Sequence, residues 1–261
     1  MSASQQLHIA VLQVSLKWES VDENLSYIES KLDEIDEVDL VLLPEMFTTG
    51  FTMNTALCHT EKYNPQAWMR HQAKKRKFSI AGSYMIHEHN QFFNQFLFVD
   101  SNGKSWAYNK KHLFSLANEN QYFSPGNQRI MAELHGWKIA LFVCYDLRFP
   151  VWNCRTPDYD YDLALYTANW PERRSFAWRS LLTARAIENQ SFIAAANRIG
   201  HDGNGVLHSG DSTILLPTGK ILKSAPPFST SVLYATLDLS HLKEFRQSFP
   251  FFNDRDSFEI I

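Results

Sequence analysis

Three predicted strands of this chain each end at a residue that could take part in covalent catalysis. These residues are Glu45, Lys110 and Cys144, and the apolar run at 139–143 leads directly into the cysteine. A cysteine acts as a nucleophile only as a thiolate, so it needs a base, and the anion formed by its attack needs a cation nearby. A carboxylate, an ammonium and a thiol therefore form a complementary set for nucleophilic catalysis.

Each of these residues also has an ordinary interpretation when it is taken alone. A free cysteine is most often a small core residue, and an isolated glutamate or lysine is most often solvated. Their shared position favours function, because open α/β sheets gather the ends of their strands at one ligand crevice. A carboxylate such as Glu45 at the lip of a buried strand is also partly desolvated, which suits it to proton transfer.

The elements that must position these residues are buried strands that alternate with helices. Helical spacing of apolar residues predicts helices over 21–35, with Asp22 as a possible N-cap, and over 65–77 and 175–190. A mixed-sheet α/β layered fold, formed by one domain over residues 1–261, is expected from this order. Continuous apolar runs predict buried strands at 7–14, 39–44, 79–86, 137–145, 161–168 and 192–196, with a hairpin at 92–100 and 105–109 and a closing hairpin series at 212–217, 220–223 and 231–237.

Composition argues against several classes of protein. The 261 residues are 44% hydrophobic and 20% charged with a net charge of -3, and no basic stripe favours nucleic acid as a partner. Residues 1–6 are polar and lack the apolar core of a signal peptide, and no apolar run is long enough to span a membrane. The three cysteines, an odd and sparse set, argue against a disulfide framework and favour a reducing cytoplasm.

The order and spacing of several motifs resemble the nitrilase superfamily, which comprises carbon–nitrogen hydrolases with a Glu-Lys-Cys triad. This resemblance runs over essentially the whole chain and implies an α-β-β-α sandwich with two mixed β-sheets flanked by helices. It also implies a homodimer or larger homo-oligomer, in which protomers pair through one helical face. The motifs are Leu43-Pro44-Glu45, Tyr108-Asn109-Lys110-Lys111-His112-Leu113-Phe114, Cys144-Tyr145-Asp146-Leu147-Arg148-Phe149-Pro150, Ala168-Asn169-Trp170-Pro171 and Asn197-Arg198.

The same resemblance assigns roles to individual residues. It implies that Glu45 is the general base, Lys110 the catalytic lysine and Cys144 the nucleophile. Glu119 resembles a further glutamate that supports the active site in this family, and the backbone N–H of Tyr145 would help Lys110 to hold the oxyanion. No metal ion or organic cofactor is implied.

A second lysine competes for the catalytic role. Lys111 follows Lys110 directly, but the family pattern places the catalytic lysine two residues before the histidine of the His-Leu-Phe motif. This spacing selects Lys110 and leaves His112 with a structural role.

Further details resemble the omega-amidase branch, whose members hydrolyse 2-oxoglutaramate and 2-oxosuccinamate to the dicarboxylic acids and ammonia. Such a substrate carries a remote carboxylate, for which an arginine is the expected partner. Arg174 is the first candidate and Arg173 the second, although each could equally be a surface residue. Aromatic side chains that could wall the pocket are Phe47, Phe51 and Trp170.

Other functions stay open at this stage. The triad is shared by relatives that act on aliphatic amides, nitriles or N-carbamoyl compounds, and only the shape of the pocket separates them. A catalytically silent binding protein on the same fold is a further alternative, although all three triad positions are filled here. A histidine-based cysteine protease is disfavoured because it gives Glu45 and Lys110 no role.

Overall fold

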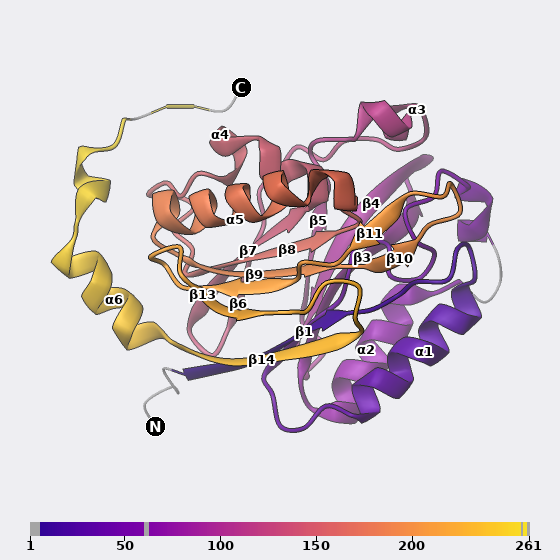
Figure 1. The fold of residues 1–261 in the computed structure, drawn as a ribbon, viewed down its shortest axis with the longest axis horizontal. Coiled ribbons are helices and arrows are strands. Elements are labelled where there is room, and N and C mark those ends of the chain that lie inside the picture. Colours follow the sequence, from indigo (N-terminus) through magenta and orange to yellow (C-terminus); the bar gives the residue numbers. More distant parts are fainter. Residues whose placement is uncertain (1–5, 60–62, 257, 260–261) are drawn as a thin grey trace.

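The chain forms two six-stranded sheets that lie face to face between layers of helices (Figure 1). The computed structural model describes residues 6–59, 63–256 and 258–259. Helices α1 and α2 cover the outer face of one sheet, and α4 and α5 cover the outer face of the other (Figure 1). The α/β sandwich with two mixed sheets that the motifs imply is therefore confirmed.

The first sheet has the strand order β14-β1-β2-β3-β4-β5. Its centre is parallel, because β1 pairs with β2 and β2 with β3 in the same direction, and the remaining pairs are antiparallel. Apolar runs form the buried strands here, as expected. The strands are β1 (Gln6–Gln13), β2 (Leu40–Leu42), β3 (Ser79–Glu88), β4 (Gln91–Val99), β5 (Ser105–Asn109) and β14 (Ser231–Asp238).

The second sheet has the strand order β13-β12-β9-β8-β7-β6, with parallel pairing of β7, β8 and β9. A separate two-stranded ribbon, β10 with β11, lies beyond the end of β9. The strands are β6 (Met131–Leu134), β7 (Trp137–Val143), β8 (Leu163–Ala168), β9 (Phe192–Asn197), β10 (Ile199–His201), β11 (Leu207–Ser209), β12 (Thr213–Leu215) and β13 (Ile221–Ser224).

The described residues form four longer helices, of which the first three begin and end close to the positions that the apolar periodicity predicts and the fourth was not predicted. They are α1 (Val21–Asp33), α2 (Pro65–Arg76), α5 (Ser175–Asn189) and α6 (Leu239–Ser248), and short helical turns are α3 (Glu119–Tyr122), α4 (Pro150–Asn153) and the 3₁₀ turns η1 (Thr55–His59), η2 (Ser115–Ala117), η3 (Cys144–Arg148), η4 (Glu172–Arg174) and η5 (Phe251–Asp254).

Three local expectations are wrong. Ser20, not Asp22, occupies the N-cap position of α1, and Asp22 lies in the first turn, where a carboxylate complements the helix dipole. The strand β14 does not continue the closing hairpin series, because it crosses to the other sheet and pairs with β1. The strand expected at 137–145 ends at Val143, and Cys144 begins a 3₁₀ helix. The polar start of the chain, residues 1–5, lies outside the described residues.

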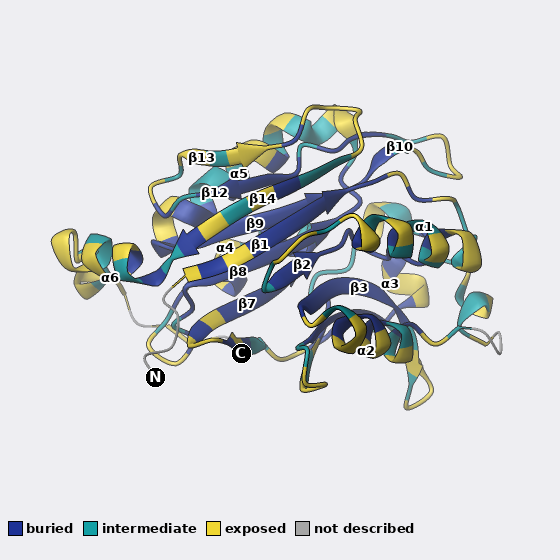
Figure 2. Ribbon diagram, turned by 90° about the horizontal axis from the view of Figure 1, so that it is seen from below, coloured by how far each residue is buried: buried dark blue, intermediate teal, exposed yellow. Residues whose placement is uncertain are grey.

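The apolar core lies between the two sheets, and the exposed residues concentrate on the outer helices and loops (Figure 2). One cluster contains Leu42 and Phe96 of the first sheet together with Leu141 and Phe142 of the second. Burial of each such side chain stabilises the fold by about 1.5–3 kcal/mol. The Thr167 hydroxyl also donates to the Leu43 carbonyl at 2.8 Å, so the two sheets are joined directly beside the ends of β2 and β8.

Candidate active site

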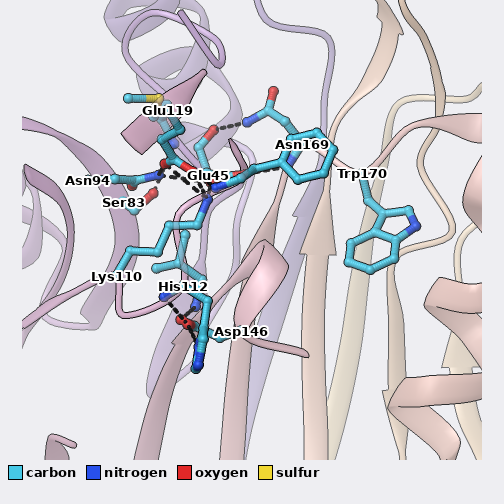
Figure 3. A network of polar contacts seen from close by, with 12 residues as sticks. Glu45, Ser83, Asn94, Lys110, His112, Glu119, Asp146, Asn169 and Trp170 are labelled. Carbon is cyan, nitrogen blue, oxygen red and sulfur yellow. Dashed lines mark hydrogen bonds and ion pairs between the residues drawn. The ribbon is translucent and has the colours of Figure 1, made fainter. Parts of the chain in front are cut away.

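The ends of strands from both sheets converge on one buried group of side chains. Glu45 follows β2, Lys110 follows β5 and Cys144 follows β7, as the sequence predicts. The Lys110 Nζ atom lies 2.9 Å from Glu45 Oε1, and it lies 3.1 and 2.9 Å from the two carboxylate oxygens of Glu119 (Figure 3). The ammonium is therefore held between two carboxylates.

This geometry separates the two adjacent lysines. The Lys110 side chain is 1% exposed and ion-paired, whereas the Lys111 ammonium lies over the Trp152 ring, 5.3 Å from its centroid. His112 is also outside the buried group, because its ring contacts Asp146 at 2.8 Å and stacks on Phe149 with centroids 3.7 Å apart. These positions agree with a structural role for His112.

For both Lys110 and Glu119, burial and the charge of the ion-pair partner shift the pKa in opposite directions. Burial alone would lower the pKa of Lys110, but the carboxylates of Glu119 and Glu45 outweigh it and raise that pKa, so the lysine stays charged. Burial raises the pKa of Glu119, the ammonium of Lys110 opposes this shift, and the charge of Glu45 adds to it. The site thus holds one permanent cation among acidic groups.

Cys144 is half-buried and stands at the entrance to the 3₁₀ helix η3. Burial raises the pKa of its thiol well above the usual range, the Glu45 charge adds to this, and the Lys110 charge opposes it. The resting thiol is therefore protonated and needs a base at the moment of attack. The backbone of Cys144 has φ of 44°, a left-handed conformation that is costly for a residue with a Cβ atom.

Two asparagines hold Glu45, and the sequence analysis gave neither a role. The Asn94 amide donates to Glu45 Oε1 at 2.8 Å, and the backbone N–H of Asn169 donates to Glu45 Oε2 at 2.8 Å. The Asn169 side chain also donates to the Glu45 carbonyl at 2.6 Å. Asn169 follows β8 directly, so its position at a strand end beside a candidate site was a usable signal, whereas Asn94 lies inside β4 and offered none.

The candidate triad opens into a cavity of about 660 Å³. Cys144, Glu45 and Lys110 line it together with Phe51, Tyr145, Trp170, Arg173 and Arg174, all expected at the site, and with other residues that include Phe114, Tyr122 and Arg148. This volume lies within the range of small-molecule sites.

The expected place of Phe47 in the pocket wall is wrong. Phe47 is fully buried in the apolar cluster on the helical side of the first sheet, against Trp68 at 5.7 Å and Tyr84 at 6.5 Å between ring centroids. The chain turns sharply at Met46, where φ is 45°, so the side chain two residues after Glu45 enters the core. Phe51, the other phenylalanine expected there, does line the cavity, with the centroid of its ring 5.1 Å from Lys110 Nζ.

Three guanidinium groups lie on one wall of the cavity. Arg148 stacks over Trp170 at 4.8 Å from the ring centroid, and Arg174 lies 5.4 Å from the centroid of Phe114. Burial and the like charges of Arg173 and Arg148 lower the pKa of Arg174. An anion bound between these groups would relieve their repulsion. Arg148 stands in one of the sequence motifs, but its place at the cavity was not predicted.

Tyr145 lies in the first turn of η3, next to the candidate nucleophile. The first N–H groups of a helical turn have no acceptor within the turn. The backbone N–H of Tyr145 is therefore free of a partner within its own turn and could donate to an oxygen atom on a group bound at Cys144. The Tyr145 ring itself packs edge-on against Phe114 at 5.0 Å between centroids.

Over residues 6–59, 63–256 and 258–259, no group of three or more His, Cys, Asp or Glu side chains could hold a metal ion. Within the same ranges, none of the helices has the length and apolar character needed to cross a membrane.

Comparison with known proteins agrees with this geometry. A family model for carbon–nitrogen hydrolases matches residues 8–247. The chain is 42% identical to the omega-amidase YafV of Escherichia coli strain K12 over 97% of this chain and 98% of that protein, and 33% identical to the 2-oxoglutaramate amidase of Bacillus subtilis strain 168 over 94% and 96%.

A solved structure is similar over nearly the whole length. XC1258 from Xanthomonas campestris, a CN-hydrolase superfamily protein with an arsenic adduct in its active site, has a TM-score of 0.94 and 36% sequence identity. The comparison covers 98% of this chain and 99% of that one. The family model and these relatives agree with the strand ends and the cavity described above. The chain therefore belongs to the carbon–nitrogen hydrolase family, the nitrilase superfamily that its motifs resemble.

Proposed function

We propose that this protein is a cysteine-dependent omega-amidase. Its substrate is a small molecule, a 2-oxo dicarboxylic acid monoamide such as 2-oxoglutaramate or 2-oxosuccinamate, and the products are the dicarboxylic acid and ammonia. The observation that carries the proposal is the placement of a thiol, a buried ammonium and a carboxylate in one cavity with three arginines. The full-length similarity to omega-amidase YafV and to 2-oxoglutaramate amidase supports the same activity.

In the first half of the proposed reaction, Glu45 takes the proton of the Cys144 thiol and the sulfur attacks the amide carbonyl. The carbonyl π electrons move to oxygen, and the resulting oxyanion is held by Lys110 and by the backbone N–H of Tyr145. When the tetrahedral intermediate collapses, the carbon–nitrogen bond breaks and Glu45 gives its proton to the nitrogen, which leaves as ammonia. A thioester on Cys144 remains.

In the second half, water replaces ammonia. Glu45 takes a proton from the water, the oxygen attacks the thioester, and the carbon–sulfur bond breaks as the proton returns to Cys144. Glu45 alternates between base and acid, which requires that its position stay fixed through both steps. Asn94, Asn169 and Lys110 supply three hydrogen bonds to its carboxylate and support this role. Glu119 keeps the Lys110 ammonium in place.

The remote carboxylate of the substrate would lie between Arg148 and Arg174, with Arg173 at the outer edge of the same wall. Arg148 and Arg174 are half-buried, whereas Arg173 is exposed. Guanidinium groups bind carboxylates through paired hydrogen bonds, which gives orientation as well as affinity. The stacking of Arg148 on Trp170 would fix the plane of that guanidinium.

The decisive experiment measures ammonia release from 2-oxoglutaramate, with glutamine and a simple nitrile assayed alongside. Fast turnover of the keto-acid amide that disappears in Cys144→Ala is expected. If the keto-acid amide is not hydrolysed while a different amide or a nitrile is, the substrate assignment is wrong although the family stands. If no substrate is turned over and Cys144 is alkylated no faster than Cys58 and Cys154, the catalytic assignment fails.

We also propose that the protein forms a homodimer or larger homo-oligomer through the outer face of α4 and α5. Val151 on α4 and Phe176 on α5 are large apolar side chains that are 55% and 79% exposed on this face. Light scattering after size-exclusion chromatography should give a molar mass at least twice that of one chain. The Phe176→Asp variant should give a lower molar mass than the wild type. Phe228→Asp, at an exposed position elsewhere, is the matched control. A monomeric wild type would overturn this proposal.

We infer further that residues 1–261 form one domain that works in the cytoplasm. The continuous core between the two sheets supports a single unit. Three free cysteines support a reducing compartment. Fractionation of the source cells tests the location, and recovery of the protein outside the cytoplasmic fraction would contradict it.

A further inference from the structure

A buried carboxylate lies behind the catalytic residues and takes no part in the proposed reaction. Asp146 is fully buried, two residues after Cys144 in η3. Its Oδ1 atom accepts from the backbone N–H of His112 at 3.0 Å and contacts Nδ1 of the same residue at 2.8 Å. Its Oδ2 atom accepts from the Tyr108 hydroxyl at 2.7 Å and from the backbone N–H of Val143 at 3.0 Å. Figure 3 shows Asp146 and His112 below Lys110.

The partners of Asp146 come from two separate segments. Val143 is the residue directly before Cys144, whereas Tyr108 and His112 flank Lys110 by two residues on either side. One carboxylate therefore ties the chain that carries the thiol to the chain that carries the ammonium. These segments belong to different sheets, so no strand pairing holds Lys110 and Cys144 at a set distance.

We propose that Asp146 is a positioning residue for the reaction, which sets the distance between the Cys144 sulfur and the Lys110 ammonium. The proposal rests on the amidase function proposed above. Asp146 is not among the residues that line the cavity, so it would act through the two backbone segments that it joins.

The backbone at Cys144 explains why such a tie is needed. A non-glycine residue with φ of 44° persists only where its surroundings fix it. Other bonds also hold the turn, because Arg185 donates to the Leu147 carbonyl at 2.7 Å and Asn153 donates to the Asp146 carbonyl at 2.7 Å. Those bonds anchor η3 to its own sheet, but among these ties only the Asp146 side chain reaches the segment of Lys110.

The test is Asp146→Asn, which keeps the shape of the side chain. Its amide has only one acceptor oxygen, so it cannot accept both from His112 and from Tyr108 and Val143 as the two carboxylate oxygens do. A displacement of about 1 Å in a catalytic site costs on the order of 100-fold in rate. We therefore expect kcat for ammonia release to fall about 100-fold, with a smaller change in KM, because the substitution removes none of the guanidinium groups proposed to bind the carboxylate.

A second readout does not depend on the substrate at all. The rate of Cys144 alkylation by iodoacetamide, followed against pH, reports the charge that surrounds the thiol, mainly Glu45, Lys110 and Glu119. If Lys110 moves away from Cys144, the thiolate loses its cation and the profile shifts to higher pH. If only the charge of Asp146 mattered, its removal would shift the profile to lower pH. This readout stays informative even if the proposed substrate is wrong.

Tyr108→Phe is the second variant and keeps every charge in place. It removes the hydroxyl that donates to Asp146 and accepts from Trp152 Nε1 at 2.9 Å. We expect a smaller shift of the alkylation profile in the same direction as in Asp146→Asn. This variant keeps the proposal testable if Asp146→Asn does not fold.

Asp162→Asn is the matched structural control. Asp162 is also buried and also accepts from a backbone N–H, that of Lys138 at 3.1 Å, but it precedes β8 and lies at the opposite end of the sheet from the site. The control should lower the melting temperature without moving the alkylation profile. The proposal is overturned if Asp146→Asn and Tyr108→Phe, once folded, leave both the profile and kcat at wild-type values, or if the profile shifts to lower pH.

Discussion

The two walls of the cavity differ in how firmly their charged groups are held. On the wall that carries the candidate triad, Lys110 is 1% exposed and is ion-paired with two carboxylates. On the arginine wall, Arg148 and Arg174 are half-buried and contact aromatic faces, and Arg173 is exposed. Buried charges require partners, so loss of a group from the triad wall should destabilise the fold, whereas the arginines of the second wall can be replaced at a smaller cost in stability.

This difference predicts two kinds of mutational effect. A change on the triad wall should damage both activity and stability, because it leaves an uncompensated charge in the protein interior. A change on the arginine wall should alter substrate affinity alone. The predictions that follow test this contrast, from the largest expected effect to the smallest.

Lys110→Met should have the largest combined effect. The variant leaves Glu45 and Glu119 buried without their shared cation, which we expect to cost about 3–5 kcal/mol of unfolding free energy. Loss of one group that holds the oxyanion should reduce kcat by about 10²–10³-fold as well. Urea unfolding and ammonia release measure the two losses. Lys111→Met is the matched control, and equal effects in the two variants would contradict the assignment of Lys110.

Glu45→Gln separates the role of a base from the role of a charge. Burial, and after it the charge of Glu45, raises the pKa of Cys144. Electrostatics alone therefore predicts that the variant holds more thiolate at neutral pH and is alkylated faster. If Glu45 is the general base, the variant is instead alkylated more slowly at pH 7, and its amidase rate falls by about 10²–10⁴-fold. Faster alkylation together with retained turnover would remove Glu45 from the mechanism.

The stability of the triad wall should also depend on pH. Burial raises the pKa of Glu119, so the stability that its protonated form contributes is fully present below the ordinary value of 4.5 and is lost as the pH rises through the folded-state value. Glu119→Gln cannot lose that proton. The unfolding free energy of the wild type, measured relative to this variant, should therefore decrease as the pH rises from 4 upwards. A difference that does not vary with pH would show that Glu119 is ionised in the folded protein without cost.

The sequence predicted the triad wall better than the arginine wall. The triad residues follow strands, whose ends meet in the fold, whereas the arginines lie in short helical turns. Glu45 and Cys144 each follow an apolar strand and Lys110 follows a hairpin strand, so their meeting at one place could be expected from strand order before any contact was known. The family, the sandwich fold and the amidase activity were expected from the same motifs, and the comparisons confirm them. The individual catalytic roles stay predictions.

What the sequence could not provide is the path of the chain beyond each strand. The left-handed backbone at Met46 directs the Phe47 side chain into the core, and no local sequence pattern predicts this turn. Asn94 contacts Glu45 from inside β4, where its polar side chain has no distinguishing neighbours in sequence. The crossing of β14 to the first sheet is likewise decided by long-range pairing with β1.

Arg174→Met and Arg148→Met should act on affinity rather than on chemistry. Loss of a charged hydrogen bond to the remote carboxylate costs about 1.5–3 kcal/mol, or roughly 10–100-fold in KM for 2-oxoglutaramate. The rate with pentanamide, which has no carboxylate, should stay close to that of the wild type. Arg173→Met, at the exposed position, should change KM by a few-fold at most. Equal losses with both substrates would place these arginines outside the carboxylate site.

The smallest effect separates two phenylalanines that lie four residues apart. Phe47→Leu removes part of a fully buried ring that packs on Trp68 and Tyr84, so it should cost about 1–2 kcal/mol of unfolding free energy without changing KM. Phe51→Leu, at the cavity, should change KM and leave stability within about 1 kcal/mol. Urea unfolding and steady-state kinetics of the pair measure both values. If the two variants exchanged these effects, the assignment of Phe47 to the core and of Phe51 to the substrate cavity would be wrong.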